Sequence, residues 1–380
     1  MFVAALEDGF RRIINENQIV SNEKQNSAKL LAQYCDILLK KNSQLKLEDL
    51  ELENRLEMCT QLFKFIDDKD IFHKYFSTHL AHRLIEDLSG GEEYEQLIIR
   101  GLQQISGMEY TSKLQRMFQD IKIGYGINLQ FKEYCEEQKI LYPVDFSSLV
   151  LTTGSWPLSN SSASQFNIPE QLKICTEGFE NFYNTIHNGR RLTWIHHCSK
   201  GEIFARFSSK TYQITMPAFM VATLLLFNDS SILNYEEIQN ATNLVDSDLR
   251  RVLKVLVTQR LLITDLKTLN KNTKFKVNSK FKHKTLKLKL GGNIQVEKTN
   301  QNVSNTGITA DRKLLLQATI VRIMKMRKEA THTQLIQEVL EQSNSHFVPE
   351  VQQIKKVIET LIDKEYLARV EGQNKYQYLA

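Results

Sequence analysis

The sequence has little proline and little cysteine, and it contains no long apolar run. Its 380 residues include five prolines, and none of them precedes Pro143. Because proline breaks helix interiors, this absence leaves the first 142 residues free to be helical throughout. The five cysteines are scattered and form no CxxC pair, so they indicate neither a disulfide framework nor a structural zinc site.

The absence of long apolar runs also limits the cellular compartments in which the protein is expected. No stretch approaches the length of a transmembrane helix, and the N-terminus carries charges where a signal peptide would be apolar. We therefore expect a soluble protein in a reducing intracellular compartment, with no membrane partner. The charge balance is mild, because 49 basic residues face 44 acidic ones and leave a net charge of +5. Such a value does not mark the whole chain as a nucleic-acid binder, so any charge argument depends on local clusters.

Apolar spacing in the proline-free region predicts a helical bundle. The apolar residues recur at intervals of three and four, as on one face of a helix. They are Leu52, Leu56, Cys59, Phe63 and Ile66, followed by Phe72, Phe76, Leu80 and Leu84. Between the periodic segments lie Gly90-Gly91, Gly107 and the pair Gly124/Gly126, where we expect the short connections of an antiparallel bundle.

After Pro143 the pattern changes to a mixture of strands and helices. Residues rich in β-branched and aromatic side chains predict strands at 148–153, 191–196, 202–207 and 212–215. From Pro217 the order becomes helix (218–227), helix (235–242), helix (248–259) and strand (261–264). The second of these helices is opened by Asn234, with Glu237 three residues on, as in a capping box.

The same order returns at the end of the chain. It predicts helices at 312–328, 333–342 and 349–364, strands at 366–370 and 375–379, and a turn at 371–374. The fold class is therefore α+β and mostly helical. We expect an N-terminal helical bundle (1–142), a central α/β domain with a winged-helix-like portion (143–290), a polar linker (291–310) and a C-terminal winged-helix domain (311–380).

Winged helices often bind DNA, so the charge of the last domain is informative. Its third helix, which would enter the major groove, carries Lys355, Lys356 and Lys364 against Glu350, Glu359 and Asp363. A groove-reading helix normally needs a cationic face, and this one is neutral. Nucleic-acid binding is therefore kept only as the alternative function. The cations gather instead on the first helix, at Arg312, Lys313, Arg322, Lys325, Arg327 and Lys328, with no acidic residue between them.

Lys325 has a distinct position on that first helix. At 100° per residue, Leu316, Ile320, Ile323 and Arg327 share one face, and Lys325 lies opposite them. Three apolar residues, Leu314, Ala318 and Val321, lie near the lysine's side and form a second apolar face. One interpretation is a solvated lysine on a helix that packs twice. The other is a lysine on a dockable domain surface, where attachment of a bulky modifier would free the domain.

Other constellations give weak signals. His196-His197-Cys198 and the pair His79/His82 place potential metal ligands close together, but no second pair follows at zinc-site spacing. Gly124-x-Gly126 lacks the remainder of a phosphate-binding fingerprint. No nucleophile-plus-base motif stands out. We therefore predict no catalytic residue, no metal site and no cofactor in this chain.

Several long segments resemble the cullin family, the scaffold subunits of RING-type ubiquitin ligases, in cullin order. They are IDDKDIF (66–72), YTSKLQRMFQDI (110–121), GSWP (154–157), GRRLTW (189–194), SKGEI (199–203), DRKLL (311–315), IVRIMKMRK (320–328) and KEYLARVEGQNKYQYLA (364–380). The resemblance implies the C-terminal half of a cullin, a scaffold rather than an enzyme. The three helical repeats that bind the substrate adaptor in cullins are missing here, which suggests an engineered half or a truncated product.

The resemblance also implies partners and sites. Lys325 matches the position that receives a ubiquitin-like modifier in the reaction called neddylation. A RING-box protein, which would hold the zinc, is expected to add a strand beside Leu149, Val150, Leu151, Leu192, Trp194 and Ile195, although by pattern alone each is more typical of an ordinary buried strand residue. That partner would recruit a ubiquitin-conjugating enzyme. A cullin exchange factor and a deneddylase complex are further expected partners, and the expected location is cytoplasmic and nuclear.

A second basic segment has nine lysines between Lys267 and Lys289 and no acidic residue. TLKLKL (285–290) alternates, which predicts a strand with its leucines toward a core and Lys287 and Lys289 outward. These lysines could guard a sheet edge against aggregation. Alternatively, Lys282, Lys284, Lys287 and Lys289 could steer the acidic tail of a conjugating enzyme, or bind nucleic acid.

Overall fold

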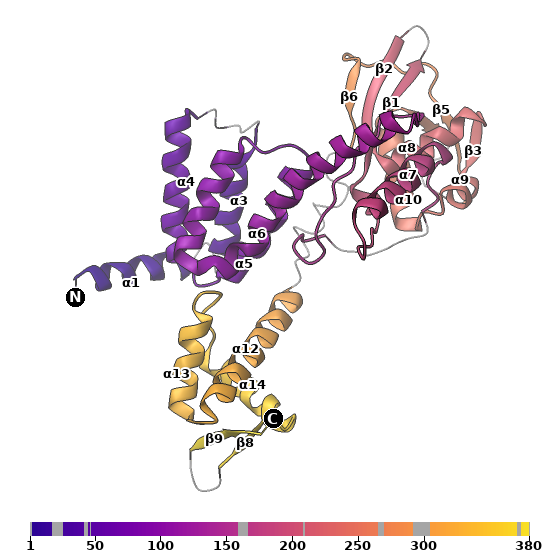
Figure 1. The fold of residues 1–380 in the computed structure, drawn as a ribbon. Coiled ribbons are helices and arrows are strands. Elements are labelled where there is room, and N and C mark those ends of the chain that lie inside the picture. Colours follow the sequence, from indigo (N-terminus) through magenta and orange to yellow (C-terminus); the bar gives the residue numbers. More distant parts are fainter. Residues whose placement is uncertain are drawn as a thin grey trace. The chain divides into compact units, whose positions relative to one another are not determined.

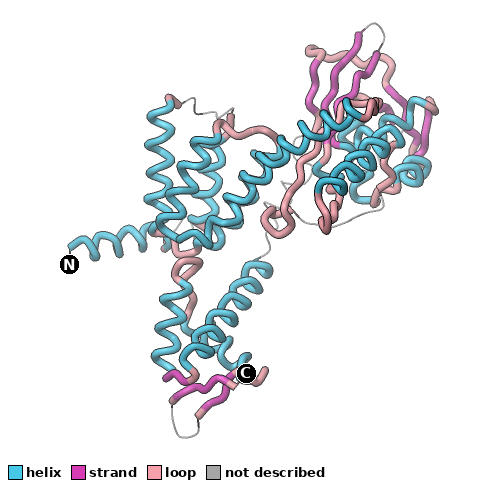
Figure 2. Tube along the Cα trace, in the orientation of Figure 1, coloured by secondary structure: helices cyan, strands magenta, loops and turns pink. Residues whose placement is uncertain are grey.

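The computed structural model describes residues 2–16, 26–41, 45, 47–158, 166–207, 210–264, 270–291, 305–370 and 374–379. The chain divides into two compact units, and each is described by itself. The first comprises Met1–Gly124, Leu149–Pro157 and Lys298–Ala380, and the second comprises Tyr125–Ser148 and Leu158–Glu297. Figure 1 follows the chain by colour, and Figure 2 separates helices from strands. The domain boundaries proposed above at residues 142, 290 and 310 remain predictions.

Helices form the first part of the first unit, as the absence of proline predicts. They are α1 (Phe2–Asn15), α3 (Ser27–Leu39), α4 (Asp49–Lys64), α5 (Lys69–Ile85) and the beginning of α6 (Glu92–Glu137). The predicted apolar stripes face the core, where Leu56, Phe63, Phe72, Phe76 and Leu80 are fully or almost fully buried. Periodicity alone therefore identified the packed faces of α4 and α5.

The glycine predictions for this region were right in part. Gly90-Gly91 lies between α5 and α6, and Gly107 interrupts α6 with a φ of 86°, a left-handed value that favours glycine. Gly124 and Gly126, by contrast, lie inside α6, so the connection predicted there is wrong. A Cβ at Gly124 would come within 3.4 Å of the Leu149 side chain. This glycine accommodates the close approach of a neighbouring segment and does not mark a turn.

A buried ionic network joins the helices. The Arg83 guanidinium is fully buried and donates to both carboxylate oxygens of Glu95, at 2.7 and 2.8 Å, and to Asp36 at 2.6 Å. His79, also buried, places its Nδ1 3.5 Å from Asp36, and because burial lowers its pKa to about 4 it is a neutral neighbour of these ion pairs. Since a buried charge is tolerated only when it is paired, these partners stabilise the fold as a set.

The second unit contains two small sheets and the helices packed on them. One sheet has the order β1-β2-β6, formed by β1 (Lys200–Phe207), β2 (Lys210–Pro217) and β6 (Lys287–Lys289). β1 and β2 are antiparallel, whereas β6 runs parallel to β2 and lies at the sheet edge. The predicted strands at 202–207 and 212–215 are confirmed. This unit also contains the end of α6, α7 (Glu170–Ile186), the short helix η1 (His196–Cys198) and the first of two winged-helix motifs.

Two winged-helix motifs are present, as predicted. The first consists of α8 (Ala218–Leu225), β3 (Ile232–Asn234), α9 (Tyr235–Thr242), α10 (Asp246–Thr258), β4 (Leu262–Thr264) and β5 (Lys274–Val277), with the short helix η2 (Leu226–Asn228) after α8. The second consists of α12 (Asn305–Arg327), β7 (Glu329–Thr331), α13 (His332–Ser343), α14 (Val351–Asp363), β8 (Leu367–Arg369) and β9 (Lys375–Tyr378). Their sheets have equivalent orders, β3-β5-β4 and β7-β9-β8.

Capping explains where two of these helices begin. The Asn234 side chain accepts from the Glu237 amide, and Glu237 reaches back to the Asn234 amide, which confirms the predicted capping box of α9. Thr331 and Gln334 form the same motif at α13. The short strands β3 and β7 that precede these helices were not predicted. Three residues carry too weak a hydrophobic pattern to identify a strand.

Two predicted strands, at 148–153 and 191–196, are wrong. Both segments are coil in the described structure, and His196 begins the short helix η1. An extended segment becomes a strand only when a neighbouring backbone completes the hydrogen-bond ladder. At Ser148, a side chain takes that role, because Asn128 accepts from the Ser148 amide at 2.9 Å and donates to its carbonyl at 2.7 Å.

The beginning of α12 also differs from the prediction. The helix starts at Asn305, seven residues before the predicted Arg312, so the polar character of 305–309 did not prevent helix formation. Once a helix is nucleated, each added residue gains a backbone hydrogen bond, and a polar first turn leaves no apolar pattern to detect. The remainder of the predicted linker, 292–304, lies outside the described residues, as does most of the predicted turn at 371–374.

Candidate modification and partner-binding sites

Lys325 is exposed on the last turn of α12. The opposite face supplies the core of the C-terminal winged helix, where Leu316, Ile320 and Ile323 are at most 2% exposed. This arrangement confirms the predicted orientation of the lysine. Arg327, placed on the core face by the helical wheel, is instead exposed and pairs with Glu338 at 2.6 Å. A guanidinium so near the helix end reaches solvent and a partner at little cost.

The backbone around Lys325 is held at the end of its helix. Lys328 adopts a left-handed φ of 65°, and its amide donates to the Met324 carbonyl at 2.8 Å. The Lys328 carbonyl accepts from the Tyr378 amide of β9 at 2.8 Å, and the Lys328 ammonium lies 5.3 Å from the Tyr378 ring centroid. Met324 itself is fully buried. Lys325 is thus an exposed side chain on a backbone held by hydrogen bonds and by the buried Met324.

The second apolar face of α12 is narrower than predicted. Leu314 is 63% exposed and Ala318 is also exposed, but Val321 packs against the core of the winged helix. An apolar face that includes Leu314 and Ala318 therefore remains on the side of Lys325.

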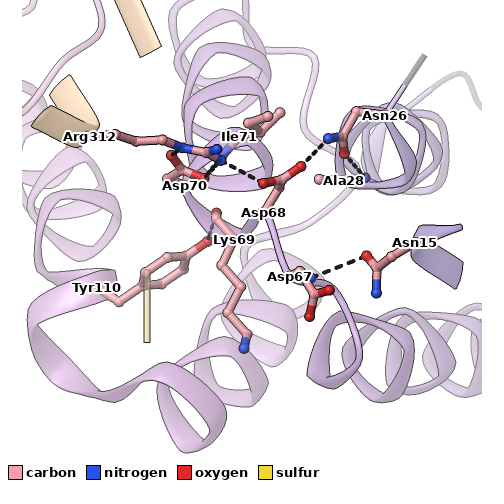
Figure 3. Close-up of polar contacts among 10 residues, drawn as sticks. All are labelled: Asn15, Asn26, Ala28, Asp67, Asp68, Lys69, Asp70, Ile71, Tyr110 and Arg312. Atoms are coloured by element: carbon pink, nitrogen blue, oxygen red, sulfur yellow. Dashed lines mark hydrogen bonds and ion pairs between the residues drawn. The ribbon is translucent and has the colours of Figure 1, made fainter. Parts of the chain in front are cut away.

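A cluster that the sequence did not reveal lies near the start of α12 (Figure 3). Arg312 donates to both carboxylate oxygens of Asp70, at 2.6 and 2.7 Å, and to Asp68 at 2.6 Å. Burial opposes the charge on the guanidinium, but the hydrogen bonds and charges of Asp70 and Asp68 outweigh it and raise the pKa of Arg312. The partners are 242 and 244 residues apart in sequence, so no local pattern could have paired them.

The residues predicted to bind a RING-box protein fall into two groups. Leu149, Val150 and Leu151 belong to the first unit, and Leu192, Trp194 and Ile195 belong to the second. From 141 to 150 the side chains alternate between exposed and half-buried, as in a strand, although this part of the described chain forms no ladder. Both groups are coil in the described structure.

Side chains of a different helix hold each of the two groups. In the first unit, the buried carboxylate of Asp120 accepts from the Thr152 amide at 2.7 Å and from Trp156 Nε1 at 2.8 Å. In the second, the Trp194 indole N–H donates to Glu180, and its ring lies 6.1 Å from both Phe146 and Phe179. Side chains of α6 and α7 therefore position these segments.

The basic segment forms the predicted strand in part. β6 covers Lys287–Lys289, with Leu288 buried and both lysines exposed, so the predicted alternation is confirmed there. Leu286 is 53% exposed and does not reach the core. Lys282 and Lys284 precede the strand and are exposed. A hollow of about 440 Å³ extends across the three strands of this sheet and is lined by Glu202, Gln213, Thr215, Lys287, Leu288 and Lys289.

The weaker candidates gain no support as metal sites. Within the described ranges, no group of three or more His, Cys, Asp or Glu side chains is arranged to hold a metal ion. His196 and His197 are half-buried in η1, and burial lowers the pKa of each. Among the helices of the described residues, none is long and apolar enough to cross a membrane.

Comparison with known proteins agrees with this architecture. Residues 1–128 match the model of the cullin alpha solenoid domain, 150–281 match the cullin alpha+beta domain, and 311–373 match the cullin protein neddylation domain. The last match includes both Arg312 and Lys325. The chain therefore belongs to the cullin family.

Curated relatives resemble the chain throughout its length. It is 41% identical to Cullin-1 of Dictyostelium discoideum over 392 residues and 37% identical to Cullin-1 of Schizosaccharomyces pombe over 386 residues. It is 34% identical to Cullin-5 of Dictyostelium discoideum over 396 residues. Each alignment covers 100% of this chain and 50%, 50% and 53% of the respective relative. The chain thus spans about half the length of these relatives.

Proposed function

We propose that this chain is the non-catalytic scaffold of a cullin-RING ubiquitin ligase and that it is activated by neddylation at Lys325. The observation that carries the proposal is the exposed Lys325 on a fixed, cationic helix within the segment that matches the neddylation domain. The catalytic groups of the ligase would come from the partners. A scaffold accelerates transfer by holding reactants in productive geometry, so it needs no nucleophile of its own.

A RING-box protein is the proposed partner of the extended segments near Leu149–Leu151 and Leu192–Ile195. An added strand binds mainly through main-chain hydrogen bonds, which require an extended backbone and little sequence specificity. The alternating burial of 141–150 and the packing of Trp194 and Leu149 onto helices support this assignment. We propose that the partner, not this chain, holds the zinc.

The ubiquitin-conjugating enzyme is the proposed partner of the basic edge formed by Lys282, Lys284, Lys287 and Lys289. Exposed lysines on an edge strand attract an acidic tail at long range without a tight contact. The same lysines also protect the edge from pairing with other chains, and the two roles are compatible. We further propose exchange-factor and deneddylase partners and a cytoplasmic and nuclear location, with no nucleic-acid or membrane partner.

The site assignment can be tested directly. The chain would be purified with a RING-box protein and supplied with the neddylation enzymes, and the isopeptide bond would be mapped by mass spectrometry. We expect modification at Lys325 and its loss in Lys325→Arg, because arginine keeps the charge but cannot form the bond. Lys313→Arg, an exposed lysine on the same helix, is the matched control and should be modified normally. Undiminished modification of Lys325→Arg would contradict the assignment.

A further inference from the structure

We propose that Arg312, Asp68 and Asp70 form a latch that docks the C-terminal winged helix of the first unit on its helical part. Arg312 lies on α12, and the two carboxylates lie at the start of α5 (Figure 3). The guanidinium makes a bidentate contact with Asp70 and a further bond to Asp68. Bidentate arginine–carboxylate pairs combine strength with a fixed geometry, which a docking contact requires.

The hydrogen bonds of the Asp68 side chain support a docking role for this cluster. Asp68 is the N-cap residue of α5, yet its side chain makes no capping hydrogen bond to that helix. An N-cap aspartate normally accepts from the helix amides, and such a bond stabilises by about 1 kcal/mol. Here the carboxylate instead accepts from Arg312 and from Asn26, which itself caps α3 by accepting from the Ala28 amide at 2.7 Å. The carboxylate therefore links the starts of α3 and α5 to the first half of α12.

Contacts made by Phe347 and His346 of the winged helix reinforce the latch. The Arg312 guanidinium lies 4.6 Å from the ring centroid of Phe347, a buried core residue of the winged helix. The Asp70 amide donates to the His346 carbonyl at 2.8 Å, and the His346 ring lies 6.3 Å from that of Tyr110. The interface thus combines one ionic contact, one backbone hydrogen bond and aromatic packing.

The latch has a defined relation to Lys325, and this step rests on the function proposed above. Thirteen residues separate Arg312 from Lys325, or about 20 Å along one helix. Lys325 is exposed while the latch is closed. The latch therefore fixes where the lysine lies and does not control its access to solvent, and its opening should leave the rate of modification unchanged.

Charge exchange combined with amide hydrogen exchange tests the latch. Asp70→Arg and Arg312→Asp would each place like charges together, and the double variant would restore the ion pair in reverse. Because the amide of residue 70 bonds to the His346 carbonyl across the interface, its protection factor, which corrects for the intrinsic exchange rate of the side chain present there, reports docking. We expect the protection factor to fall about tenfold in each single variant and to return to within about threefold of the parent in the double variant.

Controls separate the latch from folding and from the proposed function. Arg322→Gln removes a charge from the same helix at a residue that donates to Gln342, and it should leave exchange at residue 70 unchanged. Protection of Val339 in the winged-helix core should persist in all variants, which excludes unfolding. Unchanged exchange in both single variants, or no recovery in the double variant, would overturn the latch. Absence of modification at Lys325 in every variant would contradict the proposed function alone.

Discussion

Single polar side chains of α6 position the segments that follow it. Asp120 binds the backbone and hydroxyl of Thr152 and the indole of Trp156, and Asn128 binds both backbone groups of Ser148. Each side chain satisfies groups that a neighbouring strand would otherwise pair. Side-chain hydrogen bonds therefore take the place of a sheet in these segments. Replacing one such side chain should have a large effect on the free energy of unfolding.

Asp120→Ala should lower the free energy of unfolding of the first unit by about 3 kcal/mol, because it leaves the buried indole N–H of Trp156 and the partly buried donors of Thr152 unpaired. The measurement is urea unfolding followed by tryptophan fluorescence in a Trp194→Phe background, where Trp156 is the one tryptophan left. Glu109→Ala, which removes an exposed carboxylate from the same helix, should shift the midpoint little. A change as small for Asp120→Ala as for this control would show that its hydrogen bonds contribute little.

His79 should make the helical part of the first unit sensitive to acid. Burial lowers the pKa of His79 to about 4 and outweighs the opposing attraction of Asp36. The unfolded chain, with a histidine pKa near 6.5, binds a proton in the window where the folded state excludes it. Stability therefore falls as pH drops from about 6.5 to 4, by up to about 3 kcal/mol.

His79→Gln should reduce this dependence, as measured by urea midpoints between pH 7 and pH 4.5, and part of it should remain because burial also lowers the pKa of His73, on the same helix, to about 4. His283→Gln changes an exposed histidine and should retain the parent profile. If the stability of His79→Gln fell as steeply with decreasing pH as that of the parent, the acid sensitivity would come from other groups.

Among the elements, those with strong local patterns were the predictable ones. The capping box of α9 and the apolar stripes of α4, α5 and α12 gave correct helices, because caps and helical faces are set within a few residues. The segments at 148–153 and 191–196 had strand composition but form coil, because a strand depends on a distant partner. Lys325 was oriented correctly for the same local reason, whereas the pairing of Arg312 with Asp68 and Asp70 had no local signal.

The charge of β6 leads to a prediction about binding. Lys287→Glu combined with Lys289→Glu should weaken binding of an acidic peptide about tenfold at low salt, and the difference should vanish in high salt, because screening removes steering between exposed charges. The measurement is a salt titration against the peptide and against duplex DNA. Lys132→Glu combined with Lys254→Glu makes the same charge change at exposed helix residues and serves as the control. Tighter binding of the parent to DNA than to the peptide would favour the nucleic-acid alternative.

On the scale of the whole molecule, the chain combines two winged-helix motifs with a helical part. Both sheets of the winged helices have equivalent strand orders, β3-β5-β4 and β7-β9-β8. The sequence predicted this organisation because each motif repeats the same succession of helices. The sequence did not predict the long-range contacts that hold the motifs in place.

A scaffold role predicts that ubiquitin transfer depends on the partners. The chain mixed with a charged conjugating enzyme should release ubiquitin no faster than the enzyme alone, and addition of a RING-box protein should increase the rate at least about tenfold, because positioning converts an encounter into a near-unimolecular step. Discharge assays with and without each component give the rates. Transfer by the chain without the RING-box protein would require an active site of its own.

The parallel pairing of β6 with β2 has a consequence for the order of folding. Gln213 and Lys287 lie opposite each other in the sheet, with the whole first winged-helix motif between them in sequence. A parallel pair cannot close through a short turn, and the entropy of so long a loop is lost before the contact is gained. β6 should therefore dock only after the intervening motif has folded and detach before that motif unfolds. Its lysine-bearing edge then exists only in the completed domain, so an acidic partner that requires this edge would discriminate the finished protein from its folding intermediates.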